Sequence, residues 1–368
     1  MIVSIFLAII IFLTLIQAAI PRLLKKTIVF GVTIPELYVE DEKLSSYKKI
    51  YSTITLLVGL LGILLLAFWG FGSQLREETF VIIGLIIQFS ILITSMILYL
   101  YFHIQTTKRK REMKWGENLK KVRVADLASR SNDEMLPSFI FALPMAITIG
   151  LIVYTVSQYS AMPDMIPTHW GPNGQPDAFS EKSPFSVIAL LLILLVVQGM
   201  MVAINTFTKK SGVKLNAARR NSSRIQQLSF RKYTSWFMFL TTVLLTILFG
   251  FLQLTTIHGE FAGSMMMMVL PLGFFLIILL ATAFYAFKVG QGGSRIKTEV
   301  IDEETPGITD LDDDQYWKAG VFYVNKNDPS IFVEKRFGVG WTINFGNPIG
   351  YLVMIGPLLI IFVISFLL

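Results

Sequence analysis

Eight runs of about 20 consecutive apolar residues constrain this chain most, because a helix of that length crosses the roughly 30 Å hydrocarbon core of a bilayer. Only 15% of the 368 residues are charged, whereas soluble domains carry about 25%. The sequence therefore predicts an all-α polytopic membrane protein with about eight transmembrane helices. The runs cover residues 1–20, 52–71, 80–102, 138–160, 184–206, 234–257, 264–287 and 346–368.

The segments between these runs differ sharply in charge. Four of them, residues 21–51, 103–137, 207–233 and 288–345, contain 30 of the 32 Lys and Arg residues. Because Lys and Arg near membrane spans stay in the cytoplasm, we expect these four segments to be cytoplasmic and both termini to be extracellular. This arrangement predicts a multi-pass protein of the cell membrane. It also makes the lipid bilayer, rather than nucleic acid, the expected partner of the net charge of +7.

The alternation of spans and loops divides the chain into five parts. Residues 1–137 are expected to form a three-helix membrane part with basic loops, and residues 138–206 a helical pair with an ordered extracellular loop. Residues 207–288 are a second helical pair. Residues 289–345 are a small cytoplasmic β-rich domain, and residues 346–368 are the final transmembrane helix.

Two of the polar segments have patterns of their own. In the β-rich domain at residues 289–345, alternating aromatic and aliphatic residues predict strands at 316–324 and 331–336. The acidic run at 310–314 lacks the spacing and the glycine of a calcium loop, so we interpret it as a solvated linker. Because the aromatic residues of this domain need to be shielded from water and its acidic residues lie on the same side as the basic loops, we expect the domain to pack near those loops.

In the segment 21–51, the capping-box spacing of Thr33 and Glu36 predicts a short helix on the membrane surface.

Catalytic chemistry has little support in the sequence. There is no cysteine and only three histidines, His103, His169 and His258. The metalloprotease, P-loop and serine-hydrolase motifs are absent, so we expect no enzyme, no cofactor and no metal site. The eight spans contain no Asp, Glu, Lys or Arg, which argues against an ion-coupled carrier. Their amides, such as Gln17 and Gln198, are expected to form hydrogen bonds between helices.

The loop at 161–183 is the one extracellular segment with enough ordered sequence to recognise a partner. Its four prolines restrict the backbone and favour a single shape. One interpretation is a cap over the ends of the fourth and fifth spans, with His169 bonded to the backbone. The other is a recognition surface for an extracellular peptide or membrane-protein partner. The candidate recognition residues are Pro167, Thr168, His169, Trp170, Gly174, Pro176 and Asp177.

The same loop carries a resemblance to a known family. Ile166-Pro167-Thr168-His169-Trp170, Gly174 and Pro176-Asp177 are similar to the pattern of the membrane domain called domain of unknown function 1648. That domain accompanies the SdpI-type family, membrane proteins of Gram-positive bacteria that confer immunity to a secreted killing peptide. The later motif of that family has no convincing copy here.

A second resemblance lies near the C-terminus. Tyr316-Trp317, Tyr323, Asn325, Asp328-Pro329, Lys335-Arg336 and Gly340-Trp341-Thr342-Ile343-Asn344 look like domain of unknown function 5808, which occurs with the first. Together the two resemblances imply a bacterial membrane family. They favour a non-enzymatic envelope protein in peptide-toxin immunity or envelope sensing. The alternative, from the number of spans alone, is a carrier or permease-like component.

Overall fold

The eight apolar runs form helices in the computed structural model, which describes residues 2–72, 76–122, 124–126, 133–171, 174–259, 264–299 and 308–368. Within these residues, eight helices are long and apolar enough to cross a membrane. A helix satisfies its backbone hydrogen bonds internally, as hydrocarbon requires, and the predicted polytopic fold is confirmed. The helices are α1 (Ile2–Leu23), α2 (Glu42–Gly72), α3 (Glu77–Glu112), α4 (Ala142–Ser157), α5 (Ser186–Lys210), α6 (Arg220–His258), α7 (Ser264–Phe284) and α8 (Pro348–Phe366).

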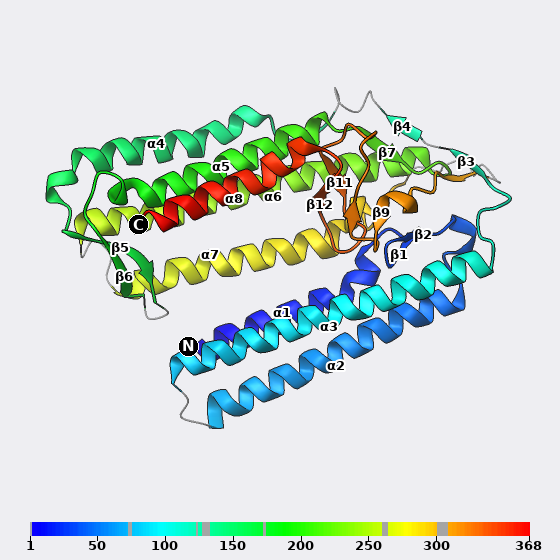
Figure 1. Ribbon diagram of the computed structural model, residues 1–368, viewed down its shortest axis with the longest axis horizontal. Coiled ribbons are helices and arrows are strands. Elements are labelled where there is room, and N and C mark those ends of the chain that lie inside the picture. The colour runs from blue at the N-terminus through cyan, green and yellow to red at the C-terminus, as the bar shows by residue number, and fades with distance from the viewer. Residues whose placement is uncertain are drawn as a thin grey trace.

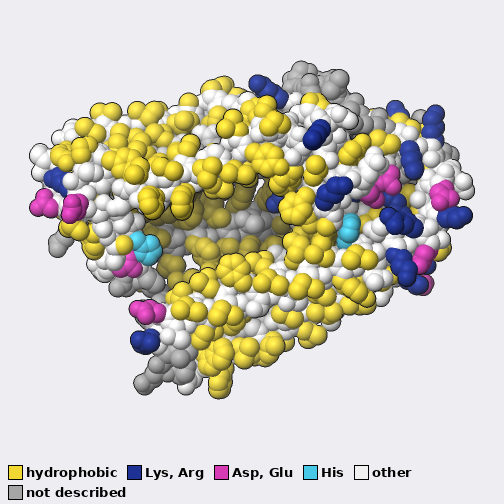
Figure 2. Space-filling model, in the orientation of Figure 1, with side chains coloured by type: hydrophobic (Ala, Val, Ile, Leu, Met, Phe, Trp, Pro, Cys, Tyr) yellow, Lys and Arg dark blue, Asp and Glu magenta, His cyan; other side chains and the backbone are white. Residues whose placement is uncertain are grey.

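The helices form two groups (Figure 1). Helices α1, α2 and α3 contact one another, while α5 lies at the centre of a second group with α4, α6 and α8. Helix α7 packs on α6 and runs between the two groups. Figure 2 shows a hollow between the groups with hydrophobic side chains around it. This surface is suited to contact with lipid chains.

The two ends of the helices carry different structures. One end holds the hairpin of strands β5 (Met165–Trp170) and β6 (Pro176–Glu181), and both chain termini lie there too (Figure 1). We call it the hairpin end. The opposite end, the basic end, carries the polar segments 24–41, 113–122, 124–126, 211–219, 290–299 and 308–347. Most of the Lys and Arg side chains in Figure 2 gather there.

Within each group, side-chain amides form hydrogen bonds between neighbouring helices, as predicted. The Nε2 atom of Gln198 donates to the hydroxyls of Thr148 and Thr246, both at 2.9 Å. In the other group, the Ser95 hydroxyl donates to Oε1 of Gln17 at 2.8 Å. These bonds satisfy buried polar groups that would otherwise be costly in hydrocarbon. Similar bonds are made by Asn205 and Gln253.

The basic end is built from short pairs of strands rather than from one sheet. The fold thus includes the expected β-rich segment before α8, although one of its strands, β8, pairs with a strand from a basic loop. The pairs are β1 (Ile28–Val29) with β2 (Val32–Thr33), β3 (Lys120–Val122) with β8 (Ile308–Asp310), β4 (Val124–Asp126) with β7 (Val213–Leu215), β9 (Trp317–Lys318) with β10 (Phe322–Tyr323), and β11 (Phe332–Glu334) with β12 (Trp341–Ile343).

Two local predictions are wrong. In the segment 21–51 the expected amphipathic surface helix is reduced to a single 3-10 turn at Glu36–Tyr38, and the residues from Glu42 onward already belong to α2. The Thr33 hydroxyl donates to Oδ1 of Asp314 at 2.8 Å rather than capping a helix. The segment 316–324 is a tight hairpin rather than one strand, since Ala319 and Gly320 have φ of 52° and 68°. Positive φ at two successive residues reverses the chain.

Candidate functional site

The sequence-predicted recognition loop folds as the β5–β6 hairpin. The strands are antiparallel, with Met165 opposite Glu181 and Pro167 opposite Phe179, and the register shifts on both sides of His169. Such a shift is a β-bulge, which redirects a side chain within a strand. The hairpin therefore gives the proline-rich loop one defined shape.

All seven predicted recognition residues lie on this hairpin. Pro167, Thr168, His169 and Trp170 belong to β5, while Pro176 and Asp177 begin β6. Gly174 lies in the turn with φ of 76° and faces Met267 of α7. The two intervening residues, Pro172 and Asn173, lie outside the described residues.

His169 and Asp177 form an exposed pair at the bulge. Nδ1 of His169 lies 2.5 Å from Oδ1 of Asp177, and the two side chains are 68% and 52% exposed. The cap interpretation expected His169 to be bonded to the backbone. The structure instead bonds it to the side chain of Asp177. A solvent-facing imidazole held by a carboxylate can present its other ring nitrogen to a ligand.

One face of the hairpin anchors it to the helices. Ile166, only 4% exposed, packs with Met162, Val187 of α5 and Ile257 of α6. The Lys182 ammonium donates to the carbonyl of Met162 at 2.7 Å. The hairpin is therefore fixed to the ends of α5 and α6.

The other face is open. Successive side chains of a strand alternate between faces, so Met165 and Phe179 point away from Ile166, and they are 50% and 48% exposed. The carboxylates of Asp164 and Glu181 are exposed nearby. We call Met165, His169, Asp177, Phe179 and these two carboxylates the hairpin face, which combines apolar side chains with acidic ones.

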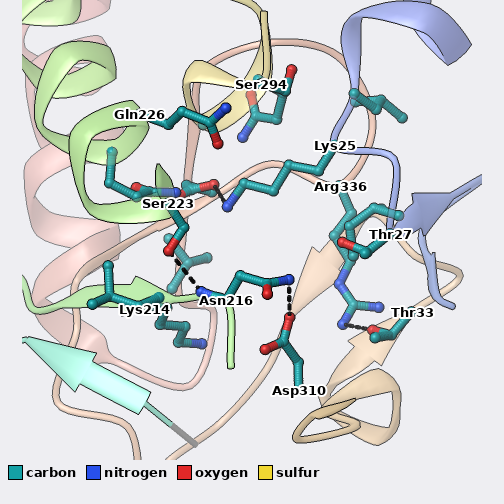
Figure 3. A pocket seen from close by; sticks show the side chains of 18 of the residues that line it. Lys25, Thr27, Thr33, Lys214, Asn216, Ser223, Gln226, Ser294, Asp310 and Arg336 are labelled. Carbon is teal, nitrogen blue, oxygen red and sulfur yellow. Dashed lines mark hydrogen bonds and ion pairs between the residues drawn. The ribbon is translucent and has the colours of Figure 1, made fainter. Parts of the chain in front are cut away.

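A second site, not predicted from the sequence, is a cavity of about 640 Å³ at the basic end. Its walls come from the end of α1, the first turns of α6, the segment after α7 and the short strands. Figure 3 shows Ser223, Gln226 and Ser294 on one side and Asp310 and Arg336 on the other. We call it the basic cavity, because eight basic and four acidic side chains line it.

Ion pairs with residues from distant segments build one wall of the basic cavity. Arg336 is 5% exposed, and its guanidinium donates to Asp313, to Oδ1 of Asp314 at 2.5 Å and to the Thr33 hydroxyl at 2.9 Å. Lys110 of α3 donates to Oδ2 of Asp314 at 2.8 Å. The acidic run is thus a partner for basic residues rather than a solvated linker, and the predicted packing of this domain near the basic loops is confirmed.

The electrostatics of the wall follow from this pairing. Burial by itself would raise the pKa of Asp314, but Arg336 and Lys110 outweigh it and hold the pKa well below its ordinary value. At Asp310 the cation that lowers the pKa is Lys25, and its effect is smaller than that of burial. Burial raises the pKa of Asp310 even though the Ala217 amide donates to it. Asp310 also accepts a hydrogen bond from Nδ2 of Asn216 at 3.3 Å. This bond fixes the loop before α6 to strand β8.

Comparisons with known proteins bear on both sites. Residues 146–195, which include the hairpin, match the model of the Domain of unknown function (DUF1648). Residues 326–351, which include Arg336, match the Family of unknown function (DUF5808). Both expected domains are present. No curated protein and no solved structure matches the chain.

Proposed function

We propose that the protein is a non-enzymatic receptor of the bacterial cell envelope that binds a secreted peptide through the hairpin face. Immunity to a peptide toxin, or sensing of the peptide, is the proposed outcome. The observation that carries this proposal is the hairpin itself. One face is fixed to α5 and α6 through Ile166, and the other leaves Met165 and Phe179 half exposed beside the His169–Asp177 pair.

The chemistry of the hairpin face selects a class of peptide. Asp164, Asp177 and Glu181 are exposed carboxylates, while Lys182 on the same loop is engaged with Met162 and the Tyr159 ring. Opposite charge guides association, and apolar contact supplies affinity. We therefore propose a basic, amphipathic peptide as the ligand. The match to DUF1648, a domain that accompanies SdpI-type immunity proteins, supports the same direction.

Variants of the hairpin face test this proposal. His169→Ala and Phe179→Ser should abolish protection of a deletion strain challenged with a panel of secreted killing peptides. Both side chains are exposed, so the thermal unfolding midpoint in detergent should stay within about 1 °C of wild type. Phe322→Ser is the matched control, because Phe322 is 51% exposed at the basic end. Protection by the His169 and Phe179 variants equal to wild type would refute the proposed recognition face.

The receptor proposal requires the hairpin end to face outward. The chain has no cysteine, so Ala178→Cys on the hairpin and Lys326→Cys at the basic end each introduce one thiol at an exposed site. A membrane-impermeant maleimide should label only the Ala178→Cys protein in intact cells, and both proteins after permeabilisation. Labelling of Lys326→Cys alone in intact cells would reverse the proposed topology.

A carrier is the second candidate function. The hollow between the two helical groups in Figure 2 favours it, since such a space can admit a solute or a lipid. The eight apolar runs contain no Asp, Glu, Lys or Arg, which argues against a carrier that couples transport to an ion. Solute uptake by purified protein in liposomes, with hairpin variants as active as wild type, would favour the carrier over the receptor.

A further inference from the structure

We infer that the basic cavity is a binding site for a phosphate-bearing anion. This site lies at the opposite end of the molecule from the hairpin face and does not depend on the proposed receptor function. Its volume of about 640 Å³ falls within the range of small-molecule sites, about 300–1,000 Å³.

The first argument is an imbalance of charge. The four acidic side chains that line the cavity all have partners: Glu334 pairs with Lys25 at 2.7 Å and Glu36 with Arg219 at 2.9 Å. Asp313 pairs with Arg336 and Lys214, and Asp310 accepts from backbone and amide donors. Four of the basic lining residues form no ion pair within the described part of the chain. These are Arg22, Lys26, Arg295 and Lys335.

The second argument is that these cations approach the cavity from several segments. Arg22 and Lys26 flank the end of α1, Arg295 follows α7, and Lys335 follows β11. The segments are held against one another, because Ser294 donates to the Leu23 carbonyl at 3.2 Å and Arg295 to the Arg22 carbonyl at 3.4 Å. Gathering like charges costs energy. An anion in the cavity would offset that cost.

The third argument concerns the type of anion. Four uncompensated cations exceed what one carboxylate requires, whereas a phosphate group has up to two negative charges and several acceptor oxygens. The hydroxyls of Thr27 and Thr298 also line the cavity and form no hydrogen bond within the described residues. Each is a further donor. The cavity thus offers both the charge and the hydrogen bonds that a phosphate group uses.

The position of the cavity allows two sources of this group. It begins where α1 ends at Leu23 and where α7 ends, which is the depth of the lipid headgroups for helices of this length. A phospholipid headgroup or a soluble phosphate compound presents the same chemistry there.

Binding measurements on the full-length protein test the inference. Purified protein in an uncharged detergent is titrated with pyrophosphate by calorimetry. In parallel, its thermal unfolding is followed in nanodiscs of phosphatidylcholine with or without phosphatidylglycerol. The variant Lys26→Gln/Lys335→Gln removes two exposed cations that have no described ion pair. Lys318→Gln/Lys326→Gln is the matched control, with the same charge change at exposed lysines outside the cavity.

The expected result is that the cavity double variant weakens binding about tenfold or more, since each substitution removes a charge-assisted hydrogen bond to the phosphate group. The control should bind as wild type does. Pyrophosphate binding that responds in this way identifies a soluble phosphate compound. Stabilisation by phosphatidylglycerol alone, lost in the cavity variant, identifies a lipid headgroup. If neither probe acts, or if both double variants lose the effect equally, the inference is overturned.

Discussion

Replacing Arg336 with methionine is expected to lower the free energy of unfolding by about 3–5 kcal/mol, the cost of removing one partner from a buried ion pair. The guanidinium bonds Asp313, Asp314 and Thr33, and Nη1 also donates to the Gly31 carbonyl at 2.6 Å. Methionine fills similar space but leaves the two carboxylates without this cation. The acidic run, the β1–β2 hairpin and the C-terminal strands then lose their common contact.

Chemical unfolding in a mild detergent measures this effect. Arg336→Lys should give an intermediate loss, since lysine retains the charge but not the planar arrangement of donors. Lys326→Met is the control for removing an exposed basic residue from the same end. A loss for Arg336→Met no greater than for Lys326→Met would show that the ion pairs do not stabilise the fold.

The same ion pairs predict how stability depends on pH. The pKa of Asp314 is held well below its ordinary value by Arg336 and Lys110 against the effect of burial. A depressed carboxyl pKa contributes stability that is present above the unfolded pKa and is lost as the pH falls through the folded one. Wild-type protein should therefore lose stability below about pH 4. Arg336→Met should lose less over that range, because its Asp314 has already lost the main cation.

The transmembrane helices could be predicted because the signal is local. Each apolar run is long enough to form a span by itself, and the amides inside the spans have few partners other than neighbouring helices. The ordered loop at 161–183 was also predictable, since Pro163, Pro167 and Pro176 fix backbone angles within the loop. Its exposed His169–Asp177 pair depends on the strand register, which loop composition does not specify.

The basic end could not be predicted in the same way, because its structure depends on contacts between residues far apart in the chain. Thr33 and Asp314 are 281 residues apart, and Arg336 and Gly31 are 305 apart. The spacing of Thr33 and Glu36 indicated a helix cap, but a distant carboxylate binds the hydroxyl instead. The basic cavity follows from the same long-range contacts. The only signal in the sequence was an acidic run facing many basic residues.

Replacing Gly293 with alanine is expected to destabilise the basic end by about 3 kcal/mol, combining overpacking with an unfavourable backbone angle. An added Cβ would lie 2.1 Å from the backbone oxygen of Gln226 in α6, and φ at Gly293 is 75°. The segment after α7 would have to move away from α6. Gln291 would then lose its two bonds to the Gly340 backbone, at 3.2 and 2.7 Å.

Gly338→Ala separates the two causes. Gly338 has a similar φ of 80°, but an added Cβ there would meet nothing within 4 Å. It should therefore cost only about 1–2 kcal/mol, the backbone penalty alone. Because Gly293 is next to Ser294 and Arg295, which close the basic cavity against α1, Gly293→Ala should also weaken pyrophosphate binding if that binding is detected, whereas Gly338→Ala should not. Equal unfolding free energies for the two variants would show that the close approach to Gln226 does not determine how the segment after α7 packs on α6.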